Sequence, residues 1–90
     1  MNIQDAIYNW LSIKVVADAR PDDDAARDTY EFFDEMLTND LEIEKVEITQ
    51  DDVLYYVHYW IAGEEHKKQY PIELIDALLD SINAEPKYNE

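Results

Sequence analysis

The chain has 90 residues, which is enough for one small domain and too few for two. It carries 22 Asp and Glu against 7 Lys and Arg, and its formal net charge of −15 argues against direct binding to DNA, RNA or an anionic membrane. Hydrophobic residues make up 47% of the chain, too many for a disordered acidic segment. The absence of cysteine excludes disulfides and zinc–thiolate sites.

The sequence shows no pattern typical of a membrane-targeting signal. The first residues carry neither a basic region nor an apolar stretch of the kind that precedes a signal cleavage site. The longest nearly apolar run, residues 53–62, is about half of the roughly 20 residues that a membrane-spanning helix needs. We therefore predict a cytoplasmic protein with a single domain over residues 1–84 and a frayed C-terminal tail over residues 85–90.

Two amphipathic helices are predicted in the first half of the chain. The first begins after Asn2, a suitable N-cap, and ends between residues 14 and 19, because a β-branched cluster blurs its apolar stripe. The second runs over residues 24–37, and Asp22, Asp23 and Asp24 are its candidate N-caps. Its expected apolar face comprises Ala26, Thr29, Tyr30, Phe33, Met36 and Leu37.

From residue 41 the hydrophobic period becomes two, which predicts β-strands. The alternation slips once between Ile43 and Val46, as expected for a bulge or a late strand start. Residues 53–62 are almost wholly β-branched or aromatic and give the strongest strand signal in the chain. Gly63-Glu64 suits a two-residue type II′ turn, with residues 66–69 as the returning strand.

A last helix is predicted to follow, with Pro71 in its first turn. The expected fold is α+β in the order α-α-β-β-β-α, a three-stranded antiparallel meander with helices packed mainly on one face. The apolar stripe of the last helix comprises Ile72, Ile75, Leu78, Leu79 and Ile82.

The two faces of the central strand differ in composition. The more β-branched set is the expected core face, and the chain has little material to cover the other face. The two sets are Val53, Tyr55, Val57, Tyr59 and Ile61 for the core, and Leu54, Tyr56, His58, Trp60 and Ala62 for the open face.

The open face is a predicted association surface. Under the Gly63-Glu64 turn, Trp60 would lie opposite Lys67 and His58 opposite Gln69. Exposed aromatic strips of this kind usually mark contacts with another protein or with a second copy of the chain. The alternative is that the first helix folds across this face and makes it a second small core. Candidate partner-binding residues are Leu54, Tyr56, His58, Trp60 and Lys67.

The sequence contains few residues in patterns that are typical of catalytic sites. His58 and His66 are predicted to face opposite sides of the sheet, where they cannot share a metal ion. There is no HExxH, GxSxG or phosphate-binding glycine loop, and Gly63 is the only glycine. The run Asp22-Asp23-Asp24 lacks the order of a calcium loop and is better explained as a helix cap. We predict no enzyme activity and no cofactor.

Acidic residues form a second candidate surface. On the second helix, Asp24, Asp28, Glu31 and Glu35 are spaced four, three and four residues apart and make a column of carboxylates about 5–6 Å apart. The plain interpretation is a solvated helix face that maintains solubility. Alternatively, the column binds a basic protein surface, or it imitates the phosphates of a nucleic acid.

Two resemblances complete the sequence argument. In size and composition the chain resembles short acidic proteins of Bacillus-type bacteria and their phages. The α-β-β-β-α part of the order resembles a double-stranded RNA-binding domain in topology, but the basic residues that such domains use are absent. The leading hypothesis is a small non-enzymatic protein-interaction or regulatory protein, and the alternative is an inhibitor that imitates nucleic acid. A small-ligand binder or enzyme is the third.

Overall fold

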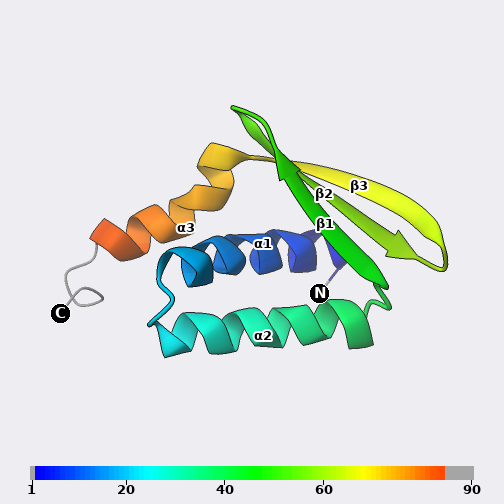
Figure 1. The fold of residues 1–90 in the computed structure, drawn as a ribbon, viewed down its shortest axis with the longest axis horizontal. Helices are drawn as coiled ribbons and strands as arrows, with labels where there is room; N and C mark the ends of the chain where they lie inside the picture. The colour runs from blue at the N-terminus through cyan, green and yellow to red at the C-terminus, as the bar shows by residue number, and fades with distance from the viewer. Residues whose placement is uncertain (1, 85–90) are drawn as a thin grey trace.

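The computed structural model describes residues 2–84 and confirms the α+β order (Figure 1). The predicted frayed tail, residues 85–90, lies outside the described residues. Within residues 2–84, no helix combines the length and apolar character that crossing a bilayer requires. The elements are α1 (Ile3–Ala19), α2 (Asp24–Asn39), β1 (Lys45–Gln50), β2 (Leu54–Ile61), β3 (Glu64–Pro71) and α3 (Ile72–Ala84).

Helix α1 is the central element of the fold and lies between α2 and the sheet (Figure 1). Asn2 is its N-cap, as predicted. The Asn2 side chain accepts a hydrogen bond from the Asp5 N–H. Ile7 and Leu11 pack into the main core beneath the sheet, whereas Ile13 and Val16 belong to a second cluster between α2 and α3. A helix buried on several sides has no single apolar stripe, which explains why the sequence pattern blurred.

Helix α2 covers one side of α1. The N-cap is Asp23, whose carboxylate accepts a hydrogen bond from the Ala26 N–H at 3.0 Å. The helix extends two residues past the predicted end, to Asn39. Thr29 was wrongly assigned to the apolar face, because it is exposed and its hydroxyl donates to the Ala25 carbonyl.

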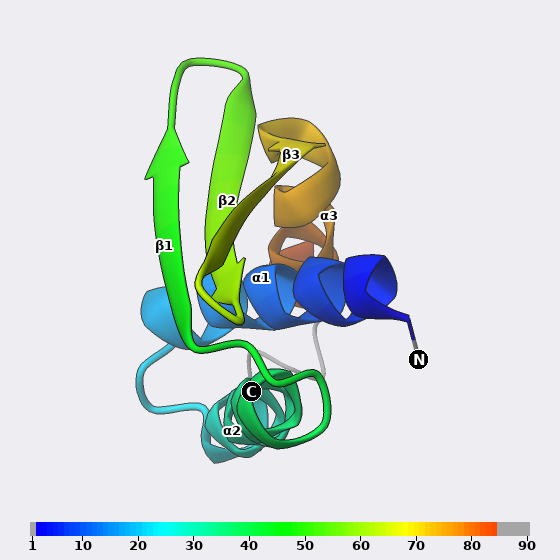
Figure 2. The ribbon, with the colours of Figure 1, turned by 90° about the vertical axis from the view of Figure 1, so that its right-hand side faces the viewer.

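The sheet is an antiparallel meander in the order β1-β2-β3, with β1 and β3 at the edges (Figure 2). Strand β1 begins late, at Lys45, as one of the two sequence interpretations expected. Ile43 precedes it and is buried in the core, after Glu42 with a positive φ of 58°. The Glu44 N–H donates to the Trp60 carbonyl while Lys45 is the ladder partner of Trp60, two residues against one as in a bulge.

The β2–β3 turn differs from the prediction. The turn residues are Ala62 and Gly63, with φ of 51° and 79°, because Ile61 pairs with Glu64. Positive φ at both positions is the type I′ geometry, which matches the twist of the flanking strands, and not the predicted type II′. The returning strand therefore begins at Glu64, and the register moves by two residues.

All three helices lie on one face of the sheet, as predicted. Val57 and Tyr59 of β2 are 0% and 4% exposed, and they share the main core with Ile7 of α1 and Ile75 of α3. Helix α1 thus packs on the expected core face and does not cover the other one. Val53 departs from the predicted core set, because it precedes β2 in the turn and is 66% exposed.

Helix α3 follows β3 directly and rests on the second half of α1. Leu79 and Ile82 pack against the second cluster, so the side of α3 that carries them faces α1. Leu78 was predicted in the apolar stripe but is 41% exposed, because α3 meets its neighbours along a narrower strip than the sequence pattern suggests.

Candidate interaction surfaces

The side of the sheet away from the helices carries a row of side chains from β2. Leu54, Tyr56, His58 and Trp60 are all half-buried, and their neighbours on β1 and β3 are mostly polar. We call these four residues, with Lys67 of β3, the open sheet face. The structure brings together all five residues that the sequence nominated for this surface.

The observed register changes which residues are cross-strand neighbours on the open sheet face. Trp60 lies opposite Glu65, and Lys67 lies opposite His58, not opposite Trp60 as predicted. The turn moved by one residue at each strand, so the pairing shifted by two and each side chain kept its predicted face. Gln69 is the partner of Tyr56.

Two lysines lie over the rings of the open sheet face. Lys45 Nζ is 5.0 Å from the centroid of the Trp60 ring, and Lys67 Nζ is 4.7 Å from that of Tyr56. Lys45 also forms an ion pair of 3.0 Å with Glu47. With Glu65, and with Asp51 at the Tyr56 hydroxyl, two positive and three negative charges lie around the rings. In a chain of net charge −15, this surface is locally close to neutral.

Hydrogen bonds fix the polar ends of the row. The Tyr56 hydroxyl donates to Asp51 at 2.5 Å, and the same carboxylate accepts from the Val53 and Leu54 N–H groups of the β1–β2 turn. The hydrogen bond from Tyr56 is the main reason why the pKa of Asp51 is lowered, and it raises the pKa of Tyr56. These hydrogen bonds hold the Tyr56 ring in place on the surface.

The two histidines lie on opposite faces of the sheet, as the sequence predicted. His58 Nδ1 is 3.0 Å from Glu65 Oε2 on the open sheet face, whereas His66 stacks on Tyr59 on the helix side with ring centroids 5.1 Å apart. Among residues 2–84, no three acidic, histidine or cysteine side chains gather closely enough to hold a metal ion. Asp23 of the acidic run acts as a helix cap.

The acidic column of α2, defined as Asp24, Asp28, Glu31 and Glu35, is fully on the surface, and all four side chains are exposed. Asp24 pairs with Arg27 at 2.5 Å. Within the described part of the chain, the other three carboxylates have no ion pair. The column therefore leaves most of its charge available to a partner.

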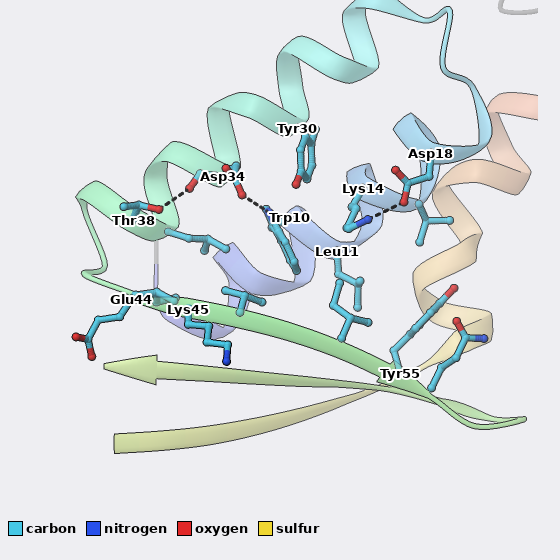
Figure 3. A pocket seen from close by; sticks show the side chains of 16 residues that line it. Trp10, Leu11, Lys14, Asp18, Tyr30, Asp34, Thr38, Glu44, Lys45 and Tyr55 are labelled. Carbon is cyan, nitrogen blue, oxygen red and sulfur yellow. Dashed lines mark hydrogen bonds and ion pairs between the residues drawn. The ribbon is translucent and has the colours of Figure 1, made fainter. Parts of the chain in front are cut away.

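A groove that the sequence did not reveal lies between α2 and β1 (Figure 3). Its volume is about 630 Å³, and α1 forms its floor. Trp10 points into it from α1 and donates to Asp34 of α2 at 3.2 Å, and Lys14 forms an ion pair of 2.7 Å with Asp18. We call this the α2–β1 groove. Its apolar lining includes Trp10, Leu11, Leu37, Ile43, Val46 and Ile48.

Sequence reasoning missed Lys45 as a neighbour of the rings. The period-two alternation of β1 could have placed it on the same face as Trp60 once the pairing between the strands was known. The α2–β1 groove had no such signal, because its width depends on how far α2 stands from the sheet.

No protein family model matches this chain, and comparison with curated proteins and with solved structures gave no match either.

Proposed function

We propose that this chain is a small non-catalytic protein-interaction protein that binds a partner protein, or a second copy of itself, through the open sheet face. The observation that carries the proposal is the row Tyr56, His58 and Trp60 on the one sheet face without a helix. Aromatic residues are enriched in the cores of protein interfaces and among their hot spots.

The charge distribution supports this surface over the rest of the molecule. A second copy, or another acidic protein, that approaches a chain of net charge −15 meets repulsion from any acidic surface. Around Trp60 and Tyr56 the charges nearly balance, and each carboxylate has a polar partner: Asp51 has Tyr56, Glu47 has Lys45 and Glu65 has His58. We expect the protein to act in the cytoplasm.

The test compares two aromatic truncations. Trp60→Ala removes the largest ring of the open sheet face, and Phe32→Ala removes a ring of α2 that is 59% exposed and lies elsewhere. Sedimentation velocity measures self-association, and capture from lysate measures other partners. We expect Trp60→Ala to lose a complex that Phe32→Ala retains. If both variants behave as the wild type does in both assays, the proposal is wrong.

The acidic column favours a second candidate, an inhibitor that imitates nucleic acid. Three of its carboxylates, Asp28, Glu31 and Glu35, are exposed and form no ion pair with another residue of the range 2–84. This candidate predicts capture of a DNA- or RNA-binding protein at low salt and its loss at high salt. Changing all three residues to Lys should abolish that capture. Binding that survives the triple change shows that the column is inert.

A further inference from the structure

We infer that the α2–β1 groove receives an extended, basic segment of a partner protein, which pairs with the free edge of β1. This site is separate from the open sheet face, because the groove opens on the helix side of the sheet. Three observations carry it: an apolar floor, an unpaired strand edge along one wall, and two lining carboxylates, Asp34 and Glu44, that form no ion pair with another described residue.

The floor provides room for side chains. A volume of about 630 Å³ is within the range of about 300–1,000 Å³ that binding pockets occupy. Val46 and Ile48 are half-buried and line the groove from β1, and Trp10 lines it from α1. Every second residue of an added strand would place its side chain on the groove side of the sheet.

The wall formed by β1 has free backbone groups. The Asp51 N–H donates to the Leu54 carbonyl, which fixes the phase of the β1–β2 ladder. In an antiparallel ladder, hydrogen-bonded and non-bonded pairs alternate, so Val46 and Ile48 direct their N–H and C=O groups away from β2. Because β1 is an edge strand of the described sheet, these groups can pair with another chain.

The wall formed by α2 determines the charge of the occupant. Asp34 and Thr38 are the polar residues of α2 that line the groove. Three carboxylates line the groove, Asp18, Asp34 and Glu44, against two cationic side chains, Lys14 and Lys45. Asp18 is paired with Lys14, whereas Asp34 and Glu44 form no ion pair with another described residue.

This excess favours a basic partner over a second copy. Two copies joined along β1 would bring two chains of net charge −15 together. The cations of the groove are already engaged, Lys14 by Asp18 at 2.7 Å and Lys45 by Glu47 at 3.0 Å. A segment with Lys or Arg alternating with apolar residues supplies what the groove lacks.

The test uses a synthetic seven-residue peptide of alternating Lys and Val with blocked ends. The controls are the same peptide with Glu in place of Lys, and a Lys–Val peptide N-methylated at alternate amides so that it cannot complete a ladder. We expect the Lys–Val peptide to bind at least about tenfold more tightly than either control. Hydrogen exchange at the Val46 and Ile48 amides should slow by a similar factor when it binds.

A matched pair of variants locates the site. Ile48→Lys places a charge in the groove and should weaken peptide binding by about tenfold or more. Thr49→Lys adds the same charge to β1 on the opposite face and should change binding by less than about threefold. If Ile48→Lys does not fold, the exchange measurement on the wild type still decides.

Three results would overturn the inference: no preference for the Lys–Val peptide, binding without slower exchange at Val46 and Ile48, or a dimer in solution that Ile48→Lys dissociates. None of them bears on the open sheet face, whose test depends on Trp60.

Discussion

Adjacent residues of β2 provide a strong contrast in stability, because they point to opposite faces of the sheet. Tyr59 is 4% exposed and belongs to the main core. An aromatic side chain buries about 150–250 Å². At about 25 cal/mol per Å² this corresponds to roughly 4–6 kcal/mol, and aromatic-to-alanine changes in cores cost about 3–5 kcal/mol. We predict that Tyr59→Ala lowers the free energy of unfolding by about 4 kcal/mol.

Trp60→Ala should lower it by about 1–3 kcal/mol. Trp60 has a cross-strand neighbour on each side, worth about 0.2–1 kcal/mol per pair, and Lys45 over its ring contributes about 0.5–1 kcal/mol. Urea unfolding followed by circular dichroism measures both variants. If Tyr59→Ala does not fold, Tyr59→Leu should still be less stable than Trp60→Ala. Equal losses, or a larger loss for Trp60→Ala, would refute the assignment of the two faces.

Three further predictions concern other parts of the fold. Burial raises the pKa of Tyr70 to about 12 from its ordinary 10, so its neutral form stabilises the fold fully below pH 10 and this contribution is lost as the pH rises to 12. Between pH 10 and 12, the free energy of unfolding of the wild type should fall by up to about 2.7 kcal/mol more than that of Tyr70→Phe, as denaturant titrations measure. Equal losses in the two proteins would contradict the burial argument. Ala62→Gly relieves the positive φ of 51° in the β2–β3 turn, and thermal unfolding should show a gain of about 0.5–1 kcal/mol, whereas a loss would argue against the type I′ turn. Glu31→Gln removes like-charge repulsion on α2, so it should raise the Tm more at 10 mM than at 1 M salt (~30 and ~3 Å screening lengths), and an effect independent of salt would rule out repulsion along the acidic column.

The sequence predicted the layers of the fold because its signals are local and periodic. Asn2 and Asp23 cap their helices through their own side chains, so the starts of α1 and α2 could be predicted within a residue or two. The two faces of β2 were also predictable, since a shift of register by two residues keeps each side chain on its face. For this reason the residues of the open sheet face were predicted correctly although the predicted turn was wrong.

The turn itself could not be predicted from the residue types. Alanine rarely adopts a positive φ, so Ala62-Gly63 gave no signal for a type I′ turn, whereas Gly63-Glu64 did for type II′. Likewise, Leu78 and Thr29 fit a helical stripe, but how wide a strip each helix buries depends on the tilt of its neighbours. The α2–β1 groove is of the same kind, because only tertiary packing determines its width.

Acrylamide quenching of tryptophan fluorescence tests most directly whether one sheet face is sealed and the other open. Trp10→Phe leaves Trp60 as the only tryptophan, and Trp60→Phe leaves Trp10, which is 4% exposed. We predict that quenching of Trp60 is several-fold stronger than that of Trp10 in the folded protein, and that the two become equal in urea. Equal and weak quenching of both in the folded state would mean that Trp60 is enclosed within its own chain, and the proposed binding surface would not exist.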